Sequence, residues 1–550
     1  MELMSCRAAL AAAVALFLLP ATYSALADDD HDRNERALQN VKHIIVVMQE
    51  NHSFDNYFGV LAYVPGGVYH PVRGGRDGDD DHGDRDSGRD GDDRDAATGC
   101  HPDDHRCVDG LACGVAQNGT LSCSNANIAS DGTQVFAFHN TNRCVNPDLD
   151  HGWFGTHREA NFARPNASLK QFLGDGFVRR NEPADGSESR DETMGYYTQA
   201  ELPFYYDLAQ KFAISDRHFS SVLGPTFPNR SYSYAATSFG HVTTNDEIPP
   251  LGGYKPLTGT IFDLLEAHAV TWANYFQDVP SGGSFRLFTL NGADPHFLPY
   301  SLFLAQVSGV PGVPVLPSVS FVDPNFGFFA RRLQNDEHPS ADIQRGQAFV
   351  SQLVNAVRNG PYWKDSIIFI TYDEHGGFYD HVRPPRAPQG GTRTPDGIEP
   401  GQCADASMLP ASARPGGGAQ CSTNQVNPAG NSVATAAALC PAFAANPTGP
   451  FPKDCASFDQ LGFRVPLIAV SPFAKPHHVS HEVSDHTSVL ALIEKRFLTP
   501  FGGDPDRRPH LTRRDQFAST LEALFDFENA PSLNTTVGTA APPLDDCGPF

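Results

Sequence analysis

The sequence contains few positive charges for its length. Its 550 residues include 40 Lys and Arg against 64 Asp and Glu, so the formal net charge is −24 at pH 7. Nonspecific binding to nucleic acid requires a basic surface, and electrostatic adhesion to anionic membranes requires clustered Lys and Arg. The charge balance argues against both, and we expect no nucleic-acid partner. An apolar fraction of 40% is still adequate for the core of one large domain or of several smaller ones.

Several sequence signatures of other enzyme classes are missing. The chain has no HExxH motif, no GxSxG motif and no Walker A motif. It also lacks a CxxC pair, which weakens a zinc site as the explanation of its cysteines. We find no internal repeat. The function must therefore be sought in other clusters of polar residues.

The N-terminus has the pattern of a secretory signal peptide over residues 1–27. Arg7 supplies a positive charge, a mostly apolar stretch covers residues 8–21, and Ala25–Ala27 fits the small-x-small rule for cleavage before Asp28. A membrane anchor is the alternative, but the stretch is short for a membrane span. No other stretch is a candidate span, so we expect no transmembrane segment in the mature chain. The pattern predicts a secreted or periplasmic protein exported by a bacterium.

The cysteines favour disulfide bonds. Removal of the signal peptide with Cys6 would leave ten of the eleven cysteines, and an even number in an exported chain favours pairing. They fall into two groups of odd size, so at least one bridge must join the groups if all ten pair. The first group is Cys100, Cys107, Cys113, Cys123 and Cys144, and the second is Cys403, Cys421, Cys440, Cys455 and Cys547.

Strand and helix patterns alternate along the chain, which predicts an α/β fold with a mainly parallel central sheet and helices on both faces. The last expected strand contains an early proline, Pro466. This predicts either an edge strand or a strand that starts beside the proline. The expected strands cover residues 44–48, 212–215, 270–276, 366–372 and 465–470, and the expected helices cover residues 202–213, 230–238, 261–268, 348–359 and 487–497.

Two irregular, cysteine-bearing insertions interrupt this pattern. Residues 73–95 are a run of Asp, Arg, Gly and His that cannot bury a core, so a solvated loop is expected. A calcium loop is the alternative, but the EF-hand order of ligands is missing. Both insertions follow strand ends, where they could border a site. The expected organisation is a signal peptide (1–27), the start of the α/β domain (28–72), an Asp-rich and Cys-rich insertion (73–147), the main α/β domain (148–385), a Pro/Gly/Ala-rich insertion (386–458) and the end of the domain with a tail (459–550).

The stretch 41–59, VKHIIVVMQENHSFDNYFG, combines a strand with a polar exit. Residues 44–48 are apolar and suit a strand that is buried on both faces. Glu50 and Asn51 follow at the carboxyl end, where ligands bind in open α/β sheets. A carboxylate suits a divalent cation, and a carboxamide can donate to a phosphate oxygen. The alternative is an ordinary strand exit in which Asn51 caps a helix.

Two later stretches have a similar design. Thr226 lies at a Gly-Pro turn that opens a helix, and free N–H groups at a helix N-terminus suit a phosphate. A threonine hydroxyl there can attack phosphorus if a cation stabilises its alkoxide, although a helix cap is the alternative. Asp373 and Glu374 directly follow the apolar strand at 366–372. They indicate a cation site, with a cap or surface role as the alternative for Asp373.

Three segments resemble motifs of the bacterial phosphoesterase family, which contains phospholipases C and acid phosphatases and belongs to the alkaline phosphatase superfamily. They are the stretch at 41–59, LGPTFPNR around Thr226, and YDEHGGFYDHV around residue 374. The resemblance implies an alkaline phosphatase-like fold. This sequence departs from the family at His52, where the family usually has arginine. By this resemblance Thr226 is the nucleophile, Glu50, Asn51, Asp373 and Glu374 bind the metal, and Asn51 and Thr226 bind the phosphate.

The family also places histidines around the phosphate. By local motif the candidates are His151 in DHGW, His338 in DEHPSADI and His486 in DHTSVL, with His381 in YDHV as a weaker one. A structural role is the alternative for each lone histidine.

The resemblance implies stepwise phosphoryl transfer through a covalent phosphoryl-enzyme, assisted by one or more divalent metal ions. Oxygen ligands alone favour calcium or magnesium, whereas added histidines allow zinc or manganese. Threonine at the nucleophile position resembles the phospholipase C branch, and serine resembles the acid phosphatase branch. We therefore expect an exported phospholipase C-like enzyme that cleaves a phospholipid or another phosphoester. The alternatives are an acid phosphatase acting on soluble monoesters and a non-catalytic surface binding protein.

Overall fold

The computed structural model describes most of the predicted α/β domain. The predicted signal peptide, the Asp-rich run at 73–95 and Cys403, Cys421, Cys440 and Cys455 lie outside the described residues. The described residues are 37–72, 99–161, 174–183, 190–242, 244, 249, 252–286, 294–388, 395–397, 404–407, 458–500, 502–503, 507–543 and 547.

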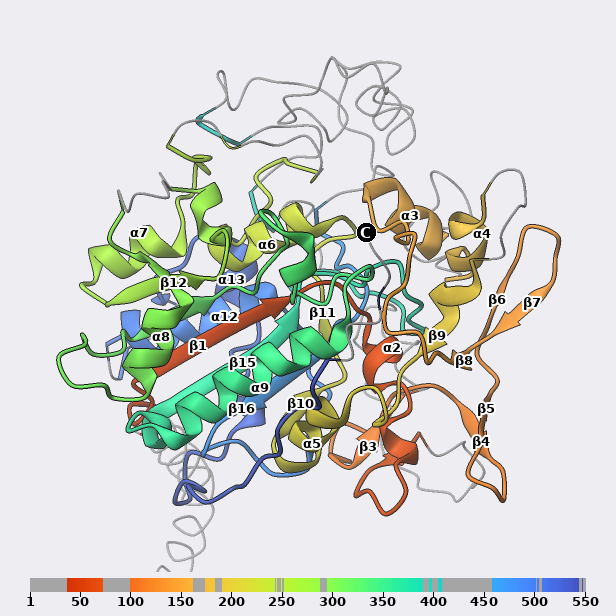
Figure 1. Cartoon of the computed structure of the whole chain (residues 1–550). Coiled ribbons are helices and arrows are strands. Elements are labelled where there is room, and N and C mark those ends of the chain that lie inside the picture. The colour runs from red at the N-terminus through yellow and green to blue at the C-terminus, as the bar shows by residue number, and fades with distance from the viewer. Residues whose placement is uncertain are drawn as a thin grey trace, which may run out of the picture.

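An eight-stranded sheet forms the centre of the protein (Figure 1). The strands pair in parallel except for β16, which runs antiparallel to both of its neighbours, so the prediction of a mainly parallel sheet is confirmed. The strand order is β13 (Phe297–Pro299), β12 (Trp272–Phe276), β14 (Val319–Val322), β1 (His43–Gln49), β15 (Ser366–Tyr372), β16 (Leu467–Val470), β10 (Ala213–Ser215) and β17 (His478–Ser480).

Strand β1 lies between β14 and β15 and is buried along almost its whole length. Its β-branched residues pack on both faces, as expected for a central parallel strand covered by helices. Gln49 pairs with Tyr372 at the carboxyl end of β15, and the Asp373 N–H donates to the Gln49 carbonyl oxygen at 3.2 Å. The register therefore brings the polar exits of two strands that are distant in sequence to one edge of the sheet.

Helices cover both faces of the sheet, as expected. Helices α5 and α8 pack against α9 on one face, and helices α6 and α13 pack against α12 on the other (Figure 1). None of the helices in the described parts of the chain is both long enough and apolar enough to cross a membrane. The bounds are α5 (Pro203–Lys211), α6 (Thr226–Ala235), α7 (Ile261–Ala267), α8 (Tyr300–Val307), α9 (Ile343–Asn359), α12 (His486–Ile493) and α13 (Arg513–Phe517), with shorter helices α2 (Phe54–Phe58), α3 (Trp153–Ala160) and α4 (Phe177–Asn181).

The expected strands and helices are present, with shifted ends. Helix α6 begins at Thr226, before the predicted start at residue 230. Pro228 lies in its first turn, where a missing N–H leaves no intrahelical bond unmade, so the proline does not delay the helix. Pro466 directly precedes β16, which agrees with a strand start. The edge-strand alternative is wrong, because β16 lies between β15 and β10.

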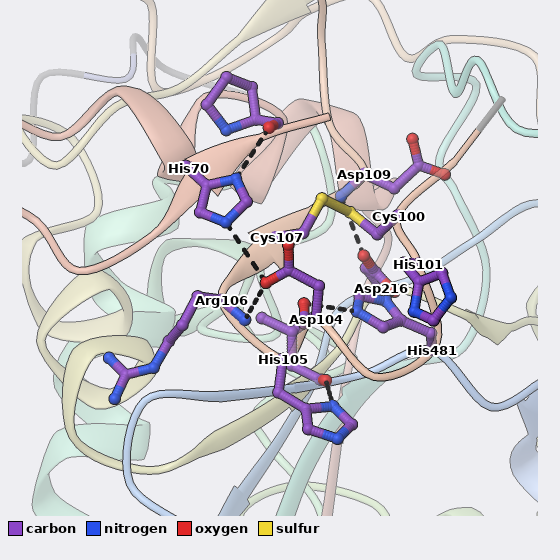
Figure 2. Close-up of a disulfide and its surroundings, with 12 residues drawn as sticks. His70, Cys100, His101, Asp104, His105, Arg106, Cys107, Asp109, Asp216 and His481 are labelled. Carbon is purple, nitrogen blue, oxygen red and sulfur yellow. Dashed lines mark hydrogen bonds and ion pairs between the residues drawn. A yellow bond between two sulfur atoms is a disulfide. The ribbon is translucent and has the colours of Figure 1, made fainter. Parts of the chain in front are cut away.

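The described part of the first insertion is built from short β-hairpins and disulfides. Cys100 is bonded to Cys107 and Cys113 to Cys123, and Figure 2 shows the first of these bridges beside Asp216 and His481. The third bridge, Cys144–Cys547, joins the first cysteine group to the second, as the odd group sizes required. The hairpin strands are β4 (Cys113–Val115) with β5 (Leu121–Cys123) and β6 (Ala126–Ile128) with β7 (Gln134–Phe136), and the short parallel pairs are β2 (His70–Pro71) with β3 (Cys107–Val108) and β8 (Phe138–His139) with β9 (Gly195–Tyr196).

Candidate active site

Thr226 is presented at the N-terminus of helix α6. Pro225 occupies the cap position with an extended backbone, and no side chain caps this helix, so the alternative role of Thr226 as a helix cap is not observed. Asn229 holds the turn that leads into the helix. Its side-chain nitrogen donates to the carbonyl oxygens of Gly224 and Pro225 at 2.8 and 3.2 Å, and its side-chain oxygen accepts from the Val222 N–H at 3.0 Å. The hydroxyl of Thr226 is thereby held on a fixed turn.

Asn51 connects Thr226 to the carboxyl end of β15. Its side-chain nitrogen lies 3.4 Å from the Thr226 hydroxyl oxygen and also contacts the Glu374 carboxylate. The Asn51 side-chain oxygen is buried and has no hydrogen-bond partner among the described residues. Gly376 is required here, because its φ of +64° and a distance of 2.0 Å from its ideal Cβ position to the Asn51 carbonyl oxygen exclude a side chain. The turn after β15 therefore packs directly on Asn51.

Arg230 joins the two strand exits. Its guanidinium lies 3.2 Å from the Glu50 carboxylate and 3.1 Å from the Asp373 carboxylate, and all three side chains are buried. Arg230 lies four residues after Thr226 on α6, so both residues face the same edge of the sheet. Our sequence reasoning missed this residue, although its spacing from Thr226 within LGPTFPNR was a usable signal.

The negative charge of the buried carboxylates exceeds the positive charge of the side chains around them. Burial and the charges of Glu50 and Glu374 raise the pKa of Asp373 well above its usual value, even though Arg230 opposes this shift. Burial and Glu50 likewise raise the pKa of Asp336, whose carbonyl oxygen accepts from the Glu50 N–H at 2.6 Å. Such a site gains stability from an additional positive charge.

Two of the predicted histidines meet beside Glu374. His151 lies 3.9 Å from the Glu374 carboxylate, and the His151 and His338 rings are 5.6 Å apart. Asp148 faces both, at 3.8 Å from His151 and 3.5 Å from His338. Although burial opposes protonation, Glu374 and Asp148 raise the pKa of His151 to about 9. His151 is therefore a cation at neutral pH, and it helps to lower the pKa of Glu374 despite burial.

His486 lies at the start of α12 and contacts the turn after β15. Its Nε2 lies 2.7 Å from the Asp373 carbonyl oxygen, and its Nδ1 is buried with no partner among the described residues. Burial lowers the pKa of His486 to about 4, so the ring is neutral. Because Nε2 donates to the carbonyl oxygen, Nδ1 of the neutral ring has a free lone pair, which can bind a metal ion or accept a hydrogen bond.

The structure places His381 in a separate ion cluster. Its ring nitrogens lie 2.7 Å from the Asp55 carboxylate and 3.2 Å from the Asp109 carboxylate. The same cluster contains Arg464, which is fully buried and pairs with Asp55 at 3.0 Å and with Asp380 at 2.9 Å. Tertiary structure thus separates His381 from His151 and His338, which meet beside Glu374, and from His486, which contacts Asp373.

The residues around Thr226 fit a divalent cation in their chemistry. Glu50, Asn51, Asp373 and Glu374 offer oxygen atoms, the Asn51 oxygen has no described partner, and the charge of Asp373 is only partly compensated. Arg230 supplies part of that compensation between Glu50 and Asp373. In the described residues, three compact groups could also hold a metal ion: Asp148, His151 and His338; Asp55, Asp380 and His381; and Cys100, Asp216 and His481.

Only the first of these three groups is well suited to a metal. In the second, Arg464 already neutralises Asp55 and Asp380. In the third, the Cys100 sulfur is bonded to Cys107, as Figure 2 shows. The first group adjoins Glu374 through His151, which would have to lose its proton before its ring nitrogen could bind a metal.

Comparison with known proteins agrees with this chemistry. The profile described as "Phosphoesterase family" matches residues 41–500. Non-specific phospholipase C6 of Arabidopsis thaliana is 30% identical over 420 residues, which cover 74% of this chain and 66% of that protein. Phospholipase C B of Mycobacterium tuberculosis is 27% identical over 93% of this chain and 84% of its own length. Non-hemolytic phospholipase C of Burkholderia pseudomallei is 26% identical over 97% of this chain and 66% of its own length.

We predict that His381 stabilises the fold in a pH-dependent way. Although burial opposes the charge, Asp55 and Asp109 raise the pKa of His381 to about 10, above its ordinary value of 6.5. Its contribution is therefore complete below pH 6.5 and is lost as the pH rises through 10. His381→Gln should lower the free energy of unfolding by about 1.5–3 kcal/mol near pH 6, and the difference should shrink towards pH 10.

Urea unfolding at several pH values measures this difference. His268→Gln is a matched control, because His268 is exposed and the only contact of its ring within the described residues is to the Leu264 carbonyl oxygen, one turn earlier in the chain. An equal loss of stability at every pH would show that His381 acts through packing and not through its charge.

Proposed function

Because the chain belongs to the phosphoesterase family, we propose that it cleaves phospholipids as a phospholipase C, with Thr226 as nucleophile and a divalent cation at the site. Family membership makes the protein a hydrolase that acts on phosphoester bonds. The observation that carries the proposal is the position of the Thr226 hydroxyl, at a helix N-terminus and 3.4 Å from the Asn51 amide nitrogen. A helix N-terminus favours a bound phosphate through its free N–H groups and its dipole.

The proposed reaction has two steps. In the first, the Thr226 hydroxyl gives up its proton to solvent, its oxygen bonds to phosphorus, and the bond from phosphorus to the leaving alcohol oxygen breaks. His151 is the best placed proton donor for that oxygen, since it is protonated at neutral pH and borders Glu374. In the second step, water bonds to phosphorus and gives a proton to His151, the bond from phosphorus to the Thr226 oxygen breaks, and that oxygen takes up a proton from solvent as the phosphomonoester leaves.

A divalent cation held by Glu50, Asn51, Asp373 and Glu374 would stabilise the Thr226 alkoxide and the charge that develops on the phosphoryl oxygens. Arg230 orients two of these carboxylates, so its role is to position the ligands. Asn51 faces both Thr226 and Glu374 and is placed to orient the phosphate.

A phospholipid substrate agrees with the surroundings of the site. A pocket of about 180 Å³ lies beside Glu50 and Arg230, and its other walls are largely apolar, including Phe227, Val279 and Phe326. Such walls suit the glycerol end of a lipid better than a free sugar or nucleoside. The relatives described above bear the name phospholipase C. An acid phosphatase that acts on soluble monoesters is the second candidate, supported only by the general resemblance of the motifs.

We predict that Thr226→Ala removes nearly all turnover, by several orders of magnitude, because it removes the attacking oxygen. Thr226→Ser should retain measurable cleavage, since it keeps the hydroxyl. Mass spectrometry of rapidly quenched reactions should find a phosphorylated peptide that contains Thr226. The matched control is Thr512→Ala, because Thr512 caps helix α13 with its side chain.

The control should melt earlier, with a loss of about 0.5–2 kcal/mol, and should turn over normally. Normal turnover by Thr226→Ala would rule out the threonine nucleophile and with it the covalent intermediate.

Removal of divalent cations should abolish activity, because Glu50, Asp373 and Glu374 would lose the charge that balances them. We expect one cation to restore turnover best when it is added back to chelator-treated protein. Circular dichroism before and after chelation separates loss of the cation from unfolding. Full turnover by protein that elemental analysis shows to be metal-free would contradict the proposed cation.

The substrate class can be tested on two substrates in parallel. We expect the purified protein to release a phosphorylated headgroup from phosphatidylcholine vesicles and to cleave a soluble phosphomonoester poorly. The Thr226→Ala variant provides the blank for both assays. Cleavage of the monoester alone would favour the acid phosphatase, and cleavage of neither, together with retained binding, would favour a non-catalytic binding protein.

A further inference from the structure

The loop that follows β14 exposes a pair of aromatic side chains. Phe328 and Phe329 are 71% and 60% exposed, and Leu333 in the same loop is 51% exposed. Residues 325–335 are called the aromatic loop below. Adjacent exposed side chains of this size are unusual on a protein surface and mark sites of interaction with an apolar partner.

The aromatic loop is held in a defined conformation. At its base, the Asn335 N–H donates to the Asn325 carbonyl oxygen at 2.9 Å, and the Asn325 N–H donates to the Asn335 side-chain oxygen at 2.6 Å. The buried carboxylate of Asp278 accepts from the Phe326 N–H at 3.1 Å and from the Phe328 N–H at 2.9 Å. The backbone that presents the aromatic pair is thus ordered before any partner binds, which lowers the entropic cost of binding.

The aromatic loop also lies at the edge of the candidate active site. It leaves the carboxyl end of β14, which pairs with β1, and it leads along the chain to His338. Phe326 lines the pocket that contains Glu50 and Arg230, and the Arg230 guanidinium lies 4.9 Å from the centre of the Phe326 ring. A partner that covers Phe328 and Phe329 therefore lies next to the pocket beside Glu50 and Arg230.

Two arginines accompany the aromatic pair. Arg331 and Arg332 are exposed, and neither forms an ion pair with another residue in the described parts of the chain. Aromatic rings that enter the interfacial region of a bilayer, with arginines beside lipid phosphates, form a common mode of membrane contact. The charge of −24 does not oppose this mode, because the contact is local and apolar and does not depend on a basic surface.

We infer that the aromatic loop docks the protein on the surface of a zwitterionic phospholipid bilayer, an inference that rests on the proposed phospholipase activity. Phe328 and Phe329 enter the interface between headgroups and acyl chains, and Arg331 and Arg332 contact lipid phosphates. Docking in this orientation brings the bilayer to the pocket beside Arg230. The loop then selects aggregated lipid over dissolved substrate without contacting the reacting atoms.

The double variant Phe328→Ser/Phe329→Ser tests this docking. Its binding to phosphatidylcholine vesicles, measured by sedimentation in the Thr226→Ala background so that lipid is not consumed, should weaken at least about tenfold. With Thr226 intact, cleavage of the vesicles should fall in parallel, whereas turnover of a water-soluble aryl ester of phosphocholine should stay at the level of the unmodified protein. Arg331→Gln/Arg332→Gln should weaken vesicle binding by a smaller factor.

A matched control comes from the other end of β14. Val310 and Val315 are 45% and 75% exposed and precede the strand, so they lie towards its amino end and away from the site. Val310→Ser/Val315→Ser should leave vesicle binding and vesicle cleavage unchanged. Thermal melting of all variants shows whether each one is folded.

The outcomes separate docking from catalysis. Unchanged vesicle binding by the aromatic double variant would overturn the docking, even if the protein is a phospholipase. An equal loss of soluble turnover would also overturn it, because the loop would then position the site. A change from dimer to monomer with normal vesicle binding would assign the loop to self-association. Vesicle binding that depends on Phe328 and Phe329, without any phospholipid cleavage, would support docking and reject the phospholipase activity.

Discussion

The ion pairs of Arg230 with Glu50 and Asp373 determine the geometry of the candidate active site. Strands β1 and β15 end at the same edge of the sheet and leave three buried carboxylates there, of which Glu50 and Asp373 pair with Arg230. Burial of unpaired charges is costly, whereas a guanidinium that reaches both carboxylates offsets much of that cost. Because Arg230 and Thr226 belong to the same helix, this pairing also sets where the threonine lies relative to both strands.

One guanidinium does not balance all the negative charge at this edge. Asp336 and Asp373 keep a strong tendency to bind a proton, and Glu374 depends on His151 and His375 for its own charge. An electrostatic deficit of this kind is costly for folding and useful for catalysis, because it creates affinity for a cation at the place where a phosphate will carry negative charge. The residues at this edge of the sheet therefore favour the binding of a ligand and do not serve stability alone.

In the cluster around Arg464, the buried negative charge is balanced without a ligand. Asp55, Asp380 and His381 are also carboxylate and imidazole groups with little exposure to solvent. Here, however, Arg464 lies fully buried among them and also donates to the carbonyl oxygen of Asp109, which belongs to the first insertion. The cluster thus ties the insertion to the α/β domain. Similar residue types have a structural role in one cluster and a proposed functional role in the other, according to whether the charges are already balanced.

Much of the fold could be predicted from local patterns. Local patterns indicate which residues are buried, and they can be recognised from neighbouring residues alone. Examples are the apolar run of β1, the helical periodicity and the apolar run before Asp373. Strands such as β14 and β17 were missed, because they have only four and three residues and their short apolar runs are interrupted by serine or histidine. The internal position of β16 could not be predicted either, because strand order depends on pairing between segments that are distant in sequence.

The sequence by itself determined the chemistry available at the site: carboxylates and an amide at strand exits, and a threonine at a helix start. Only the tertiary structure decided which groups meet. Arg230 joins Glu50 to Asp373, and His151 and His338 meet beside Glu374, whereas His381 belongs to another ion cluster. The physical reason is that short motifs encode local backbone geometry, whereas the partners of a buried charge come from segments hundreds of residues away. Their pairing is set by the register of the sheet and by the electrostatic cost of leaving any of them alone.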